Sequence, residues 1–574
     1  MRRDLRGLAD SSFDLVVIGG GVFGAAAAWE AVSRGLSVAL IERADFASYT
    51  SANSYKVVHG GIRYIQHGDV FRIRQSAGER SAFLRIAPHL VRPLPIAIPT
   101  YGHGMKGKAA LRVGVAAYDA VTFDRNRGIT DPKRQIPSGR STSKQETLDL
   151  FPNLHADGLT GAVIFNDGQM LNPPRLVLAF VQSAAEAGAV AANYVEATGL
   201  IREGDKVVGV EAKDVLTGAD FSIRSKLVLN AAGPYAEGFV AKALNKVTPD
   251  GAAAYSRDAC FVVNRRLFDH DIALAAQGQT HDPDAVISRG NRHLFIAPWR
   301  NYTLVGTWHV VWKKDPAAIT VEDDELQSFI DEVQAGYPGL DLTLDDVGIW
   351  NCGLVPFGEN EEGATHLRYG HRSSLIDHGK VDGIDGLMTL IGVRFTTGRY
   401  EAEKAVDIIA ERLGQRGVSR TAFTPLKGGD LSGGIESCHQ QAIRDHGKHC
   451  SPGVLRSLLH HYGAGLDELI KTAADEPRLL APMGDSAVIG AQVLHAVREE
   501  TAHNLGDVVF RRTDLATGSY PGEVALRQVA DVMAPMLGWD DQRIQDEIDS
   551  VRTRFPKRAA LAADRERADG VAAA

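Results

Sequence analysis

The feature that most constrains this chain is a glycine-rich turn that joins a buried strand to an alanine-rich helix near the N-terminus. Asp14–Ile18 is a short run rich in β-branched residues, the turn Gly19–Gly24 follows it, and the pattern predicts a helix over Ala25–Ser33. A second strand is expected over Ser37–Ile41, and Glu42 stands at its end. This order predicts a strand–helix–strand unit in a parallel sheet that is buried on both faces.

The spacing Gly19-x-Gly21-x-x-Gly24 predicts a dinucleotide site in this unit. The first glycine allows the tight turn, the second lets a pyrophosphate approach the backbone, and the third lets the helix pack closely on the strand. The phosphates would rest on the helix N-terminus, and Glu42 would accept hydrogen bonds from an adenosine ribose. The turn alone does not choose between NAD and FAD.

Further strand and helix patterns divide the 574-residue chain into three folded units. Gly386–Gly392 returns to the buried-strand pattern, whereas Pro452–Phe555 has helical periodicity throughout. The predicted fold class is α/β, with a Rossmann-like nucleotide-binding domain, an inserted α+β substrate or cap domain that has a mixed sheet, and an all-α C-terminal domain. The expected boundaries are 13–245 plus 385–415, 246–384 and 430–556, with a flexible tail over 557–574.

Composition and charge exclude several classes of protein. The 63 Lys and Arg residues against 71 Asp and Glu residues give a net charge of −8, which excludes a nucleic-acid binder that works by bulk positive charge. Four cysteines do not make a disulfide framework, and no long apolar window suits a bilayer, so we expect a cytoplasmic protein. The cysteines and histidines between Cys438 and Cys450 lack a zinc-type spacing, so no metal site is predicted.

A longer motif follows Glu42. Thr50-Ser-Ala-Asn-Ser-Tyr-Lys-Val-Val-His-Gly-Gly-Ile-Arg-Tyr-Ile65 closely resembles the signature of FAD-dependent glycerol-3-phosphate dehydrogenases, in which a serine-rich loop, a lysine and His-Gly-Gly-hydrophobic-Arg-Tyr follow the second strand. The resemblance extends from about residue 13 to residue 555, and it includes the turn Val228–Pro234 and the loop at Thr396. It implies the fold of that family and a bound FAD.

The resemblance also implies which residues hold the cofactor. They come from the glycine-rich turn, the acid after the second strand, the serine-rich loop and later turns. The implied residues are Gly19, Gly21, Val22, Phe23, Gly24, Glu42, Thr50, Ser51, Ser54, Lys56, Gly61, Val195, Ala232, Gly233, Arg394, Thr396 and Thr397. His59, Arg63 and Tyr64 would lie near the isoalloxazine ring and the substrate.

The segments that would build the substrate pocket depart from the family pattern at four places. The family's Ser-Gly-Val-Arg-Pro is Cys352-Gly-Leu-Val-Pro356 here, so Val355 stands where an arginine would bind a phosphate. Gly-Gly-Lys becomes Gly392-Val-Arg394, and Lys-Gly-Ser-His becomes Arg257-Asp-Ala-Cys260. Trp308-His309 replaces the usual Thr/Ser-Asp pair.

Two explanations of these departures stay open. In the first, Arg257, Arg292 or Arg394 rebuilds a phosphate site from another direction. In the second, the substrate is another polyol, a sugar derivative or an alcohol without phosphate, and Trp308 either stacks on it or belongs to the core. Asp167-Gly168 resembles a turn, and no chemistry is assigned to it.

The predicted reaction is FAD-dependent oxidation of a secondary hydroxyl of glycerol 3-phosphate or a related polyol phosphate to the ketone, with hydride transfer to flavin N5. His59 is the first candidate for the base that takes the hydroxyl proton and His309 is the second, because imidazole titrates near neutral pH. Arg63 and Arg394 would orient the substrate and stabilise developing charge. The alternatives are a family member re-purposed for a non-phosphorylated alcohol, sugar or sugar acid, and a flavin-binding redox or interaction module without catalysis.

The resemblance also bears on the partners. Electrons would pass to quinone, oxygen or a carrier protein, and bacterial members of the family sit on the membrane face. His103–Arg127 has basic residues among apolar ones, so a weak peripheral contact with the inner face of the membrane is weighed against an ordinary surface helix. A homodimer is also compatible with the sequence.

Overall fold

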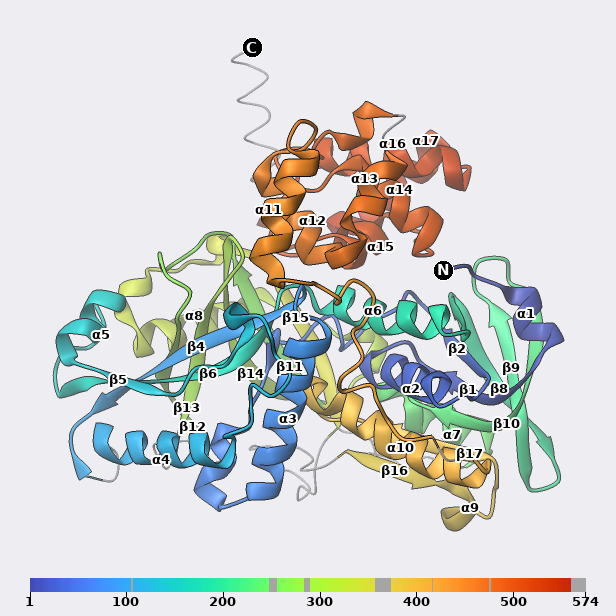
Figure 1. Ribbon diagram of the computed structural model, residues 1–574, viewed down its shortest axis with the longest axis horizontal. Helices are drawn as coiled ribbons and strands as arrows, with labels where there is room; N and C mark the ends of the chain where they lie inside the picture. The colour runs from blue at the N-terminus through green and yellow to red at the C-terminus, as the bar shows by residue number, and fades with distance from the viewer. Residues whose placement is uncertain are drawn as a thin grey trace.

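The computed structural model consists of two β-sheet domains with a helical domain stacked on both (Figure 1). It describes residues 1–104, 107–246, 255–282, 290–356, 373–415, 417–473 and 476–558, without the side chains of residues 66, 67, 280–282, 290–292 and 356. The predicted tail beyond residue 558 therefore lies outside the described residues.

The first sheet contains the predicted strand–helix–strand unit. β1 (Ser12–Ile18) pairs in parallel with β2 (Val38–Glu42) and β10 (Asp220–Asn230), and α2 (Val22–Ser33) joins β1 to β2. The strand order is β16-β17-β10-β1-β2-β7, and β9 and β8 extend the sheet from β10. The other strands are β7 Val190–Asn193, β8 Val195–Glu203, β9 Lys206–Asp214, β16 Ser374–Asp377 and β17 Leu387–Ile391.

The core of this domain fixes the position of the glycine-rich turn. Ala25–Ala28 of α2 are buried, and these small side chains let α6 (Pro173–Glu186) and α10 (Gly398–Arg412) pack against α2. The N-terminus of α2 is thereby held over the carboxyl end of β1. Open α/β sheets bind their ligands at this edge.

The second sheet is mixed and has nine strands in the part of the chain that the structure describes, in the order β15-β11-β14-β13-β12-β4-β6-β3 with β5 paired to β6. Its strands are β3 Val57–Val58, β4 Val91–Tyr101, β5 Arg140–Thr142, β6 Leu159–Met170, β11 Tyr255–Val263, β12 Ala273–Asp282, β13 Gly290–Trp299, β14 Tyr302–Trp312 and β15 Val347–Pro356. This sheet corrects the expected domain boundaries, because β3–β6 come from the segment that was assigned to the nucleotide-binding domain. Local patterns do not show that β4 pairs with β12, so the sequence alone places β3–β6 in the wrong domain.

The two faces of the second sheet have different partners. Ile96, Ile98 and Phe165 lie on the face that looks toward the first domain. Ala97 and Ile164, their neighbours along the strands, pack on the opposite face in the same core as α8 (Asp323–Gly336). Because strand side chains alternate between the two faces, a shift of one residue decides which side a functional group reaches.

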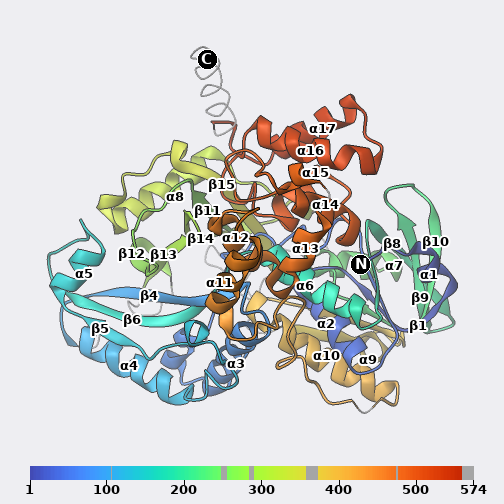
Figure 2. The same ribbon diagram turned by 45° about the horizontal axis from the view of Figure 1, so that its top comes forward.

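The C-terminal domain is all-helical, as predicted, and lies above both sheet domains (Figures 1 and 2). Its helices are α11 Gly434–His446, α12 Pro452–Tyr462, α13 Leu466–Thr472, α14 Gly490–Glu499, α15 Leu505–Asp507, α16 Glu523–Leu537 and α17 Asp541–Arg552. Arg512 donates to both carboxylate oxygens of Asp45 at 2.7 Å, and Arg175 of α6 donates to Glu500 at 2.6 Å. The first ion pair attaches the helical domain to the loop that follows β2, and the second attaches it to α6.

The remaining helices are α1 Leu5–Asp10, α3 Val70–Ile86, α4 Lys108–Val121, α5 Lys144–Leu150, α7 Ala236–Ala243 and α9 His378–Val381. Within the described residues, no helix has both the length and the apolar composition needed to cross a membrane. Over the same residues, no three His, Cys, Asp or Glu side chains are grouped so that they could hold a metal ion.

Candidate active site

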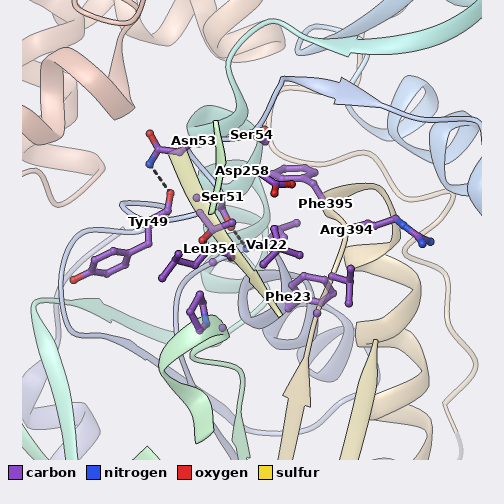
Figure 3. Close-up of a pocket in the computed structure, with 18 of the residues that line it drawn as sticks. Val22, Phe23, Tyr49, Ser51, Asn53, Ser54, Asp258, Leu354, Arg394 and Phe395 are labelled. Atoms are coloured by element: carbon purple, nitrogen blue, oxygen red, sulfur yellow. Dashed lines mark hydrogen bonds between the residues drawn. The ribbon is translucent and has the colours of Figure 1, made fainter. Parts of the chain in front are cut away.

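A cavity of about 1090 Å³ lies between the two sheets and brings together most of the predicted site residues (Figure 3). Its cofactor wall consists of the lining residues from 18–54, 195–198, 231–239 and 392–396, and its substrate wall consists of those on β4, β6 and β11–β15. The predicted residues that line the cavity are Gly19, Gly21, Val22, Phe23, Glu42, Thr50, Ser51, Ser54, His59, Gly61, Arg63, Tyr64, Val195, Ala232, Gly233, His309, Val355, Arg394 and Thr396.

The glycine-rich turn shapes the cofactor wall through backbone contacts. Gly19 has a φ of +105°, in the region that favours glycine, and a Cβ atom on Gly24 would lie 1.8 Å from the Gly19 carbonyl oxygen. Helix α2 begins after Gly21 without a side-chain cap, and the Val22 amide donates to Ser51 Oγ at 3.0 Å. Figure 3 shows Val22, Phe23 and Ser51 close together on this wall. Exposed amides at a helix N-terminus suit a pyrophosphate.

The Glu42 side chain is held at the end of β2 by hydrogen bonds from two nearby backbone amides. Its Oε2 accepts from the Gly20 amide at 2.7 Å, and its Oε1 accepts from the Ala44 amide at 2.9 Å. Burial raises the pKa of Glu42, and the two amides oppose that rise. A carboxylate oxygen has two lone pairs, so each Glu42 oxygen keeps one for a ribose hydroxyl.

The serine-rich loop connects the two walls. Thr50 Oγ1 donates to the Leu354 carbonyl of β15 at 3.2 Å, and the His59 amide donates to Thr396 Oγ1 at 3.0 Å. The second bond joins two motifs that are far apart in the sequence. Through these contacts, the loop that carries His59 is fixed against both the cofactor wall and the substrate wall.

His59 is paired with a carboxylate that the sequence did not link to it. His59 Nδ1 lies 3.1 Å from Asp167 Oδ2, and Asp167 Oδ1 accepts from the Gly60 amide at 2.6 Å. Burial alone would raise the pKa of Asp167, but hydrogen bonds from His59 and Gly60 and the charge of Arg80 lower it. Asp167 therefore orients the His59 ring through Nδ1, and Nε2 is the ring nitrogen that is left to face a substrate.

A buried network holds this pair in place. Arg80 NH1 donates to the Asn166 carbonyl at 2.7 Å and lies 3.3 Å from Asp167 Oδ1. The Tyr118 hydroxyl donates to the Gly60 carbonyl at 2.9 Å. Asp167 lies within β6 and not in a turn, which corrects the expectation from sequence.

Two arginines meet at Tyr64, beside the loop that carries His59. The Arg63 guanidinium carbon lies 5.5 Å from the centre of the Tyr64 ring, and that of Arg394 lies 5.3 Å from it. Burial, with the charges of Arg63 and Arg72, lowers the pKa of Arg394 from its ordinary value. The charge of the Glu401 carboxylate opposes this fall only in part, so an anion between the two arginines would relieve their repulsion.

The substrate wall contains Asp258, His309 and Val355, but not Arg257 or Trp308. The prediction that Arg257 and Trp308 bind substrate is therefore wrong. Both face the other side of the sheet, where the Arg257 guanidinium and the Trp308 indole bond to Glu325, and Trp308 packs on Phe329 at 4.3 Å between ring centres. The side chain of Arg292 lies outside the described part of the chain.

Three predicted cofactor residues do not line the cavity. Gly24 lies under the turn, where it allows α2 to approach β1. Lys56 is buried with Nζ 4.9 Å from the Trp299 ring centre, and burial lowers the pKa of Lys56 to about 8. The Thr397 hydroxyl donates to the Arg394 carbonyl at 3.3 Å and so supports the loop from behind.

Residues 14–385 match the model of the FAD dependent oxidoreductase family, and residues 419–544 match the C-terminal domain of alpha-glycerophosphate oxidase. The glycerol-3-phosphate dehydrogenase of Mycobacterium leprae is 30% identical over 552 residues, which cover 94% of this chain and 88% of that protein. The chain belongs to the FAD-dependent glycerol-3-phosphate dehydrogenase family. The glycerol-3-phosphate dehydrogenase of Synechocystis sp. is 29% identical over 566 residues, covering 95% of this chain and 97% of the relative.

A solved member of the family shows the same fold. The glycerol-3-phosphate dehydrogenase from Bacillus halodurans, complexed with FAD, has a TM-score of 0.72 at 24% identity, and the match covers 96% of this chain and 95% of that one. The cofactor wall fits the same cofactor, because Gly21 leaves the N-terminus of α2 without an N-cap side chain and Glu42 at the end of β2 can accept from a ribose. The predictions of a Rossmann-like α/β fold and of an FAD-dependent oxidoreductase are confirmed.

Proposed function

We propose that this dehydrogenase oxidises the secondary hydroxyl of glycerol 3-phosphate or a related polyol phosphate to the ketone. The observation that carries the proposal is the arginine pair, Arg63 and Arg394, beside Tyr64 on the same cavity as His59. Arginine forks match phosphate oxygens, and two neighbouring guanidinium groups form a site for a doubly charged anion. The pair thus supplies the phosphate contact that Val355 does not.

His59 is the base of the proposed reaction. Its Nδ1 is held by Asp167, so Nε2 is the atom that accepts the substrate's hydroxyl proton. Asp167 acts as a positioning residue, because it fixes the ring and stabilises the positive charge that the imidazole gains. FAD, when bound, supplies the two-electron oxidant for the carbon that bears the hydroxyl. Arg63 and Arg394 would also balance negative charge on the substrate oxygen.

The electron acceptor is proposed to be a quinone reached at a membrane surface. Val70 and Phe71, at the start of α3, are 50% and 63% exposed, and Val113 and Phe123, on and just after α4, are 69% and 79% exposed. The Arg74 guanidinium lies over the Phe123 ring, so basic and apolar side chains share this surface. If the Phe71→Ser, Phe123→Ser double variant no longer sediments together with lipid vesicles while the wild type does, this would support the contact.

The homodimer stays a prediction.

The test of the phosphate site compares three arginine variants. In Arg63→Gln and Arg394→Gln we expect the KM for glycerol 3-phosphate to rise about 10- to 100-fold, because each loses a charge-assisted bond to phosphate. Arg72→Gln is the matched control: Arg72 also borders the Tyr64 ring, but it pairs with Asp69 at 3.2 Å and does not line the cavity. Equal effects of all three variants would contradict the proposal.

A further inference from the structure

We infer that Asp258 and His309 bind the hydroxylated end of a phosphorylated polyol longer than glycerol 3-phosphate. This inference rests on the proposed function, because the arginine pair is taken to hold the phosphate. It deepens that function by naming the substrate class and the residues that select it.

The register of the second sheet places the two side chains together. Asp258 of β11 is directly opposite His309 of β14 in an antiparallel pair, so both side chains stand on the same face. That face is the substrate wall, since both residues line the cavity. On its other side Asp258 faces Gly353 of β15, which has no side chain to cover it. Figure 3 shows Asp258 among the residues that surround the cavity.

The chemistry of this pair suits hydroxyl groups and not a phosphate. Ser256 Oγ donates to Asp258 Oδ1 at 2.7 Å, and a carboxylate offers about four acceptor sites, so it can bind several hydroxyl donors at once. A carboxylate on the wall repels a phosphate, and Val355 on the neighbouring strand offers no donor. Neighbouring hydroxyls of a polyol can donate to Asp258 and exchange hydrogen bonds with His309.

The arginine pair and the Asp258–His309 pair together define the substrate. The phosphate is directed to Arg63 and Arg394, and the sheet receives the part of the chain that extends beyond the oxidised carbon. Glycerol 3-phosphate has a single hydroxyl on that side, whereas four- and five-carbon polyol phosphates have two or more. A site built to bind hydroxyls discriminates against an analogue that lacks them, because its polar groups lose their partners.

The experiment follows anaerobic reduction of the flavin in the purified FAD-loaded enzyme by stopped flow. Its probes are glycerol 3-phosphate, a tetritol phosphate, a pentitol phosphate and the corresponding unphosphorylated polyols. For each probe we divide the rate constant of flavin reduction by the dissociation constant. In the wild type we expect this value to be about 10- to 100-fold higher for the tetritol or pentitol phosphate than for glycerol 3-phosphate.

In Asp258→Ala the ratio of the value for the longer phosphate to that for glycerol 3-phosphate should fall close to one. Asp258→Asn keeps the shape of the side chain and serves if the alanine variant does not fold, and Asp220→Ala on the exposed start of β10 is the control.

Each result has a distinct meaning. A wild-type ratio near one, with good reduction by glycerol 3-phosphate, overturns the inference and leaves the proposed function intact. A high ratio that survives in both Asp258 variants overturns the assignment to Asp258. Reduction by no phosphorylated polyol, or by unphosphorylated polyols only, overturns the proposed function and the inference with it.

Discussion

The two walls of the cavity are built by different means. The cofactor wall is formed mainly by backbone groups, such as the turn at Gly19 and the uncapped start of α2, and buried ion pairs at Asp45 support it from behind. The substrate wall is formed by side chains that stand on one face of a sheet, such as Asp258 and His309. Backbone geometry constrains the first wall, whereas the second can change its chemistry one side chain at a time. Three of the four departures from the family pattern fall on strands of the second sheet, and the fourth falls on the Arg394 loop of the cofactor wall.

The largest expected effect comes from the residue that carries out proton transfer. In His59→Asn we expect flavin reduction by the substrate to slow by about 10²- to 10⁴-fold, the usual contribution of a general base. FAD content should be unchanged, because His59 contacts the cofactor wall through its backbone amide. Stopped-flow reduction and the flavin-to-protein ratio measure the two effects. The exposed His103→Asn is the control, and a His59→Asn rate within threefold of wild type would remove His59 from the mechanism.

The second prediction breaks the support behind the cofactor wall. Arg512→Leu leaves the buried Asp45 carboxylate with one arginine fewer, and we expect the free energy of unfolding to fall by about 3–5 kcal/mol. Arg511 and Arg512 hold the pKa of Asp45 well below its usual range although burial alone would raise it. Urea titration gives the change. Arg140→Leu, in the exposed pair with Glu146, should cost only about 0–1 kcal/mol, and similar losses in both variants would contradict a buried clamp.

The third prediction concerns the turn itself. A methyl group on Gly24 would lie 1.8 Å from a backbone oxygen, so Gly24→Ala must push α2 away from β1. Such overpacking costs about 1–3 kcal/mol, which corresponds to roughly 10- to 100-fold weaker FAD binding if the strain falls on the site. Gly114→Ala in α4, where nothing lies within 4 Å, is the matched control. FAD titration of the apoprotein would show no difference between the two variants if this account of the turn were wrong.

The residues that could be predicted from sequence belong mostly to the cofactor wall. The glycine spacing, Glu42 and the Thr50–Ile65 motif each consist of residues that are close together in the sequence, so they can be recognised without knowledge of the fold. Asp167 is 108 positions from His59, and only the pairing of β6 in the second sheet brings them together. Sequence reasoning therefore did not find this pair.

The substrate wall shows a second limit of sequence reasoning. The residues expected to bind substrate included Arg257 and Trp308, and each is the immediate neighbour of a residue that does line the cavity. Because successive strand residues face opposite sides, the sequence located the right strands and the wrong face. The gain of an acid at Asp258 was visible, but its position in the cavity required the register of β11 and β14.

The smallest expected effect concerns His89, a buried histidine at the interface with the helical domain that does not line the cavity. Burial, with the charge of Arg175, lowers the pKa of His89 to about 3, compared with 6.5 for the free side chain. The unfolded chain therefore binds a proton that the folded protein does not, so this stability is complete above pH 6.5 and is lost as the pH falls toward 3. At pH 5 the loss is about 2 kcal/mol.

His89→Gln should remove that part of the pH dependence, whereas His155→Gln on an exposed loop should not. Thermal unfolding at pH 7 and pH 5 gives the comparison. An unchanged pH dependence in His89→Gln would show that His89 is not the titrating group.

The phosphate site is tested most directly by anaerobic bleaching of the flavin band with matched pairs of phosphorylated and unphosphorylated polyols, beginning with glycerol 3-phosphate and glycerol. We expect bleaching by the phosphorylated member of a pair and none by its unphosphorylated partner at the same concentration, because Arg63 and Arg394 hold the phosphate. Equal bleaching by both members, or bleaching by the unphosphorylated polyol alone, would contradict the claim that a changed substrate wall still serves a phosphorylated substrate.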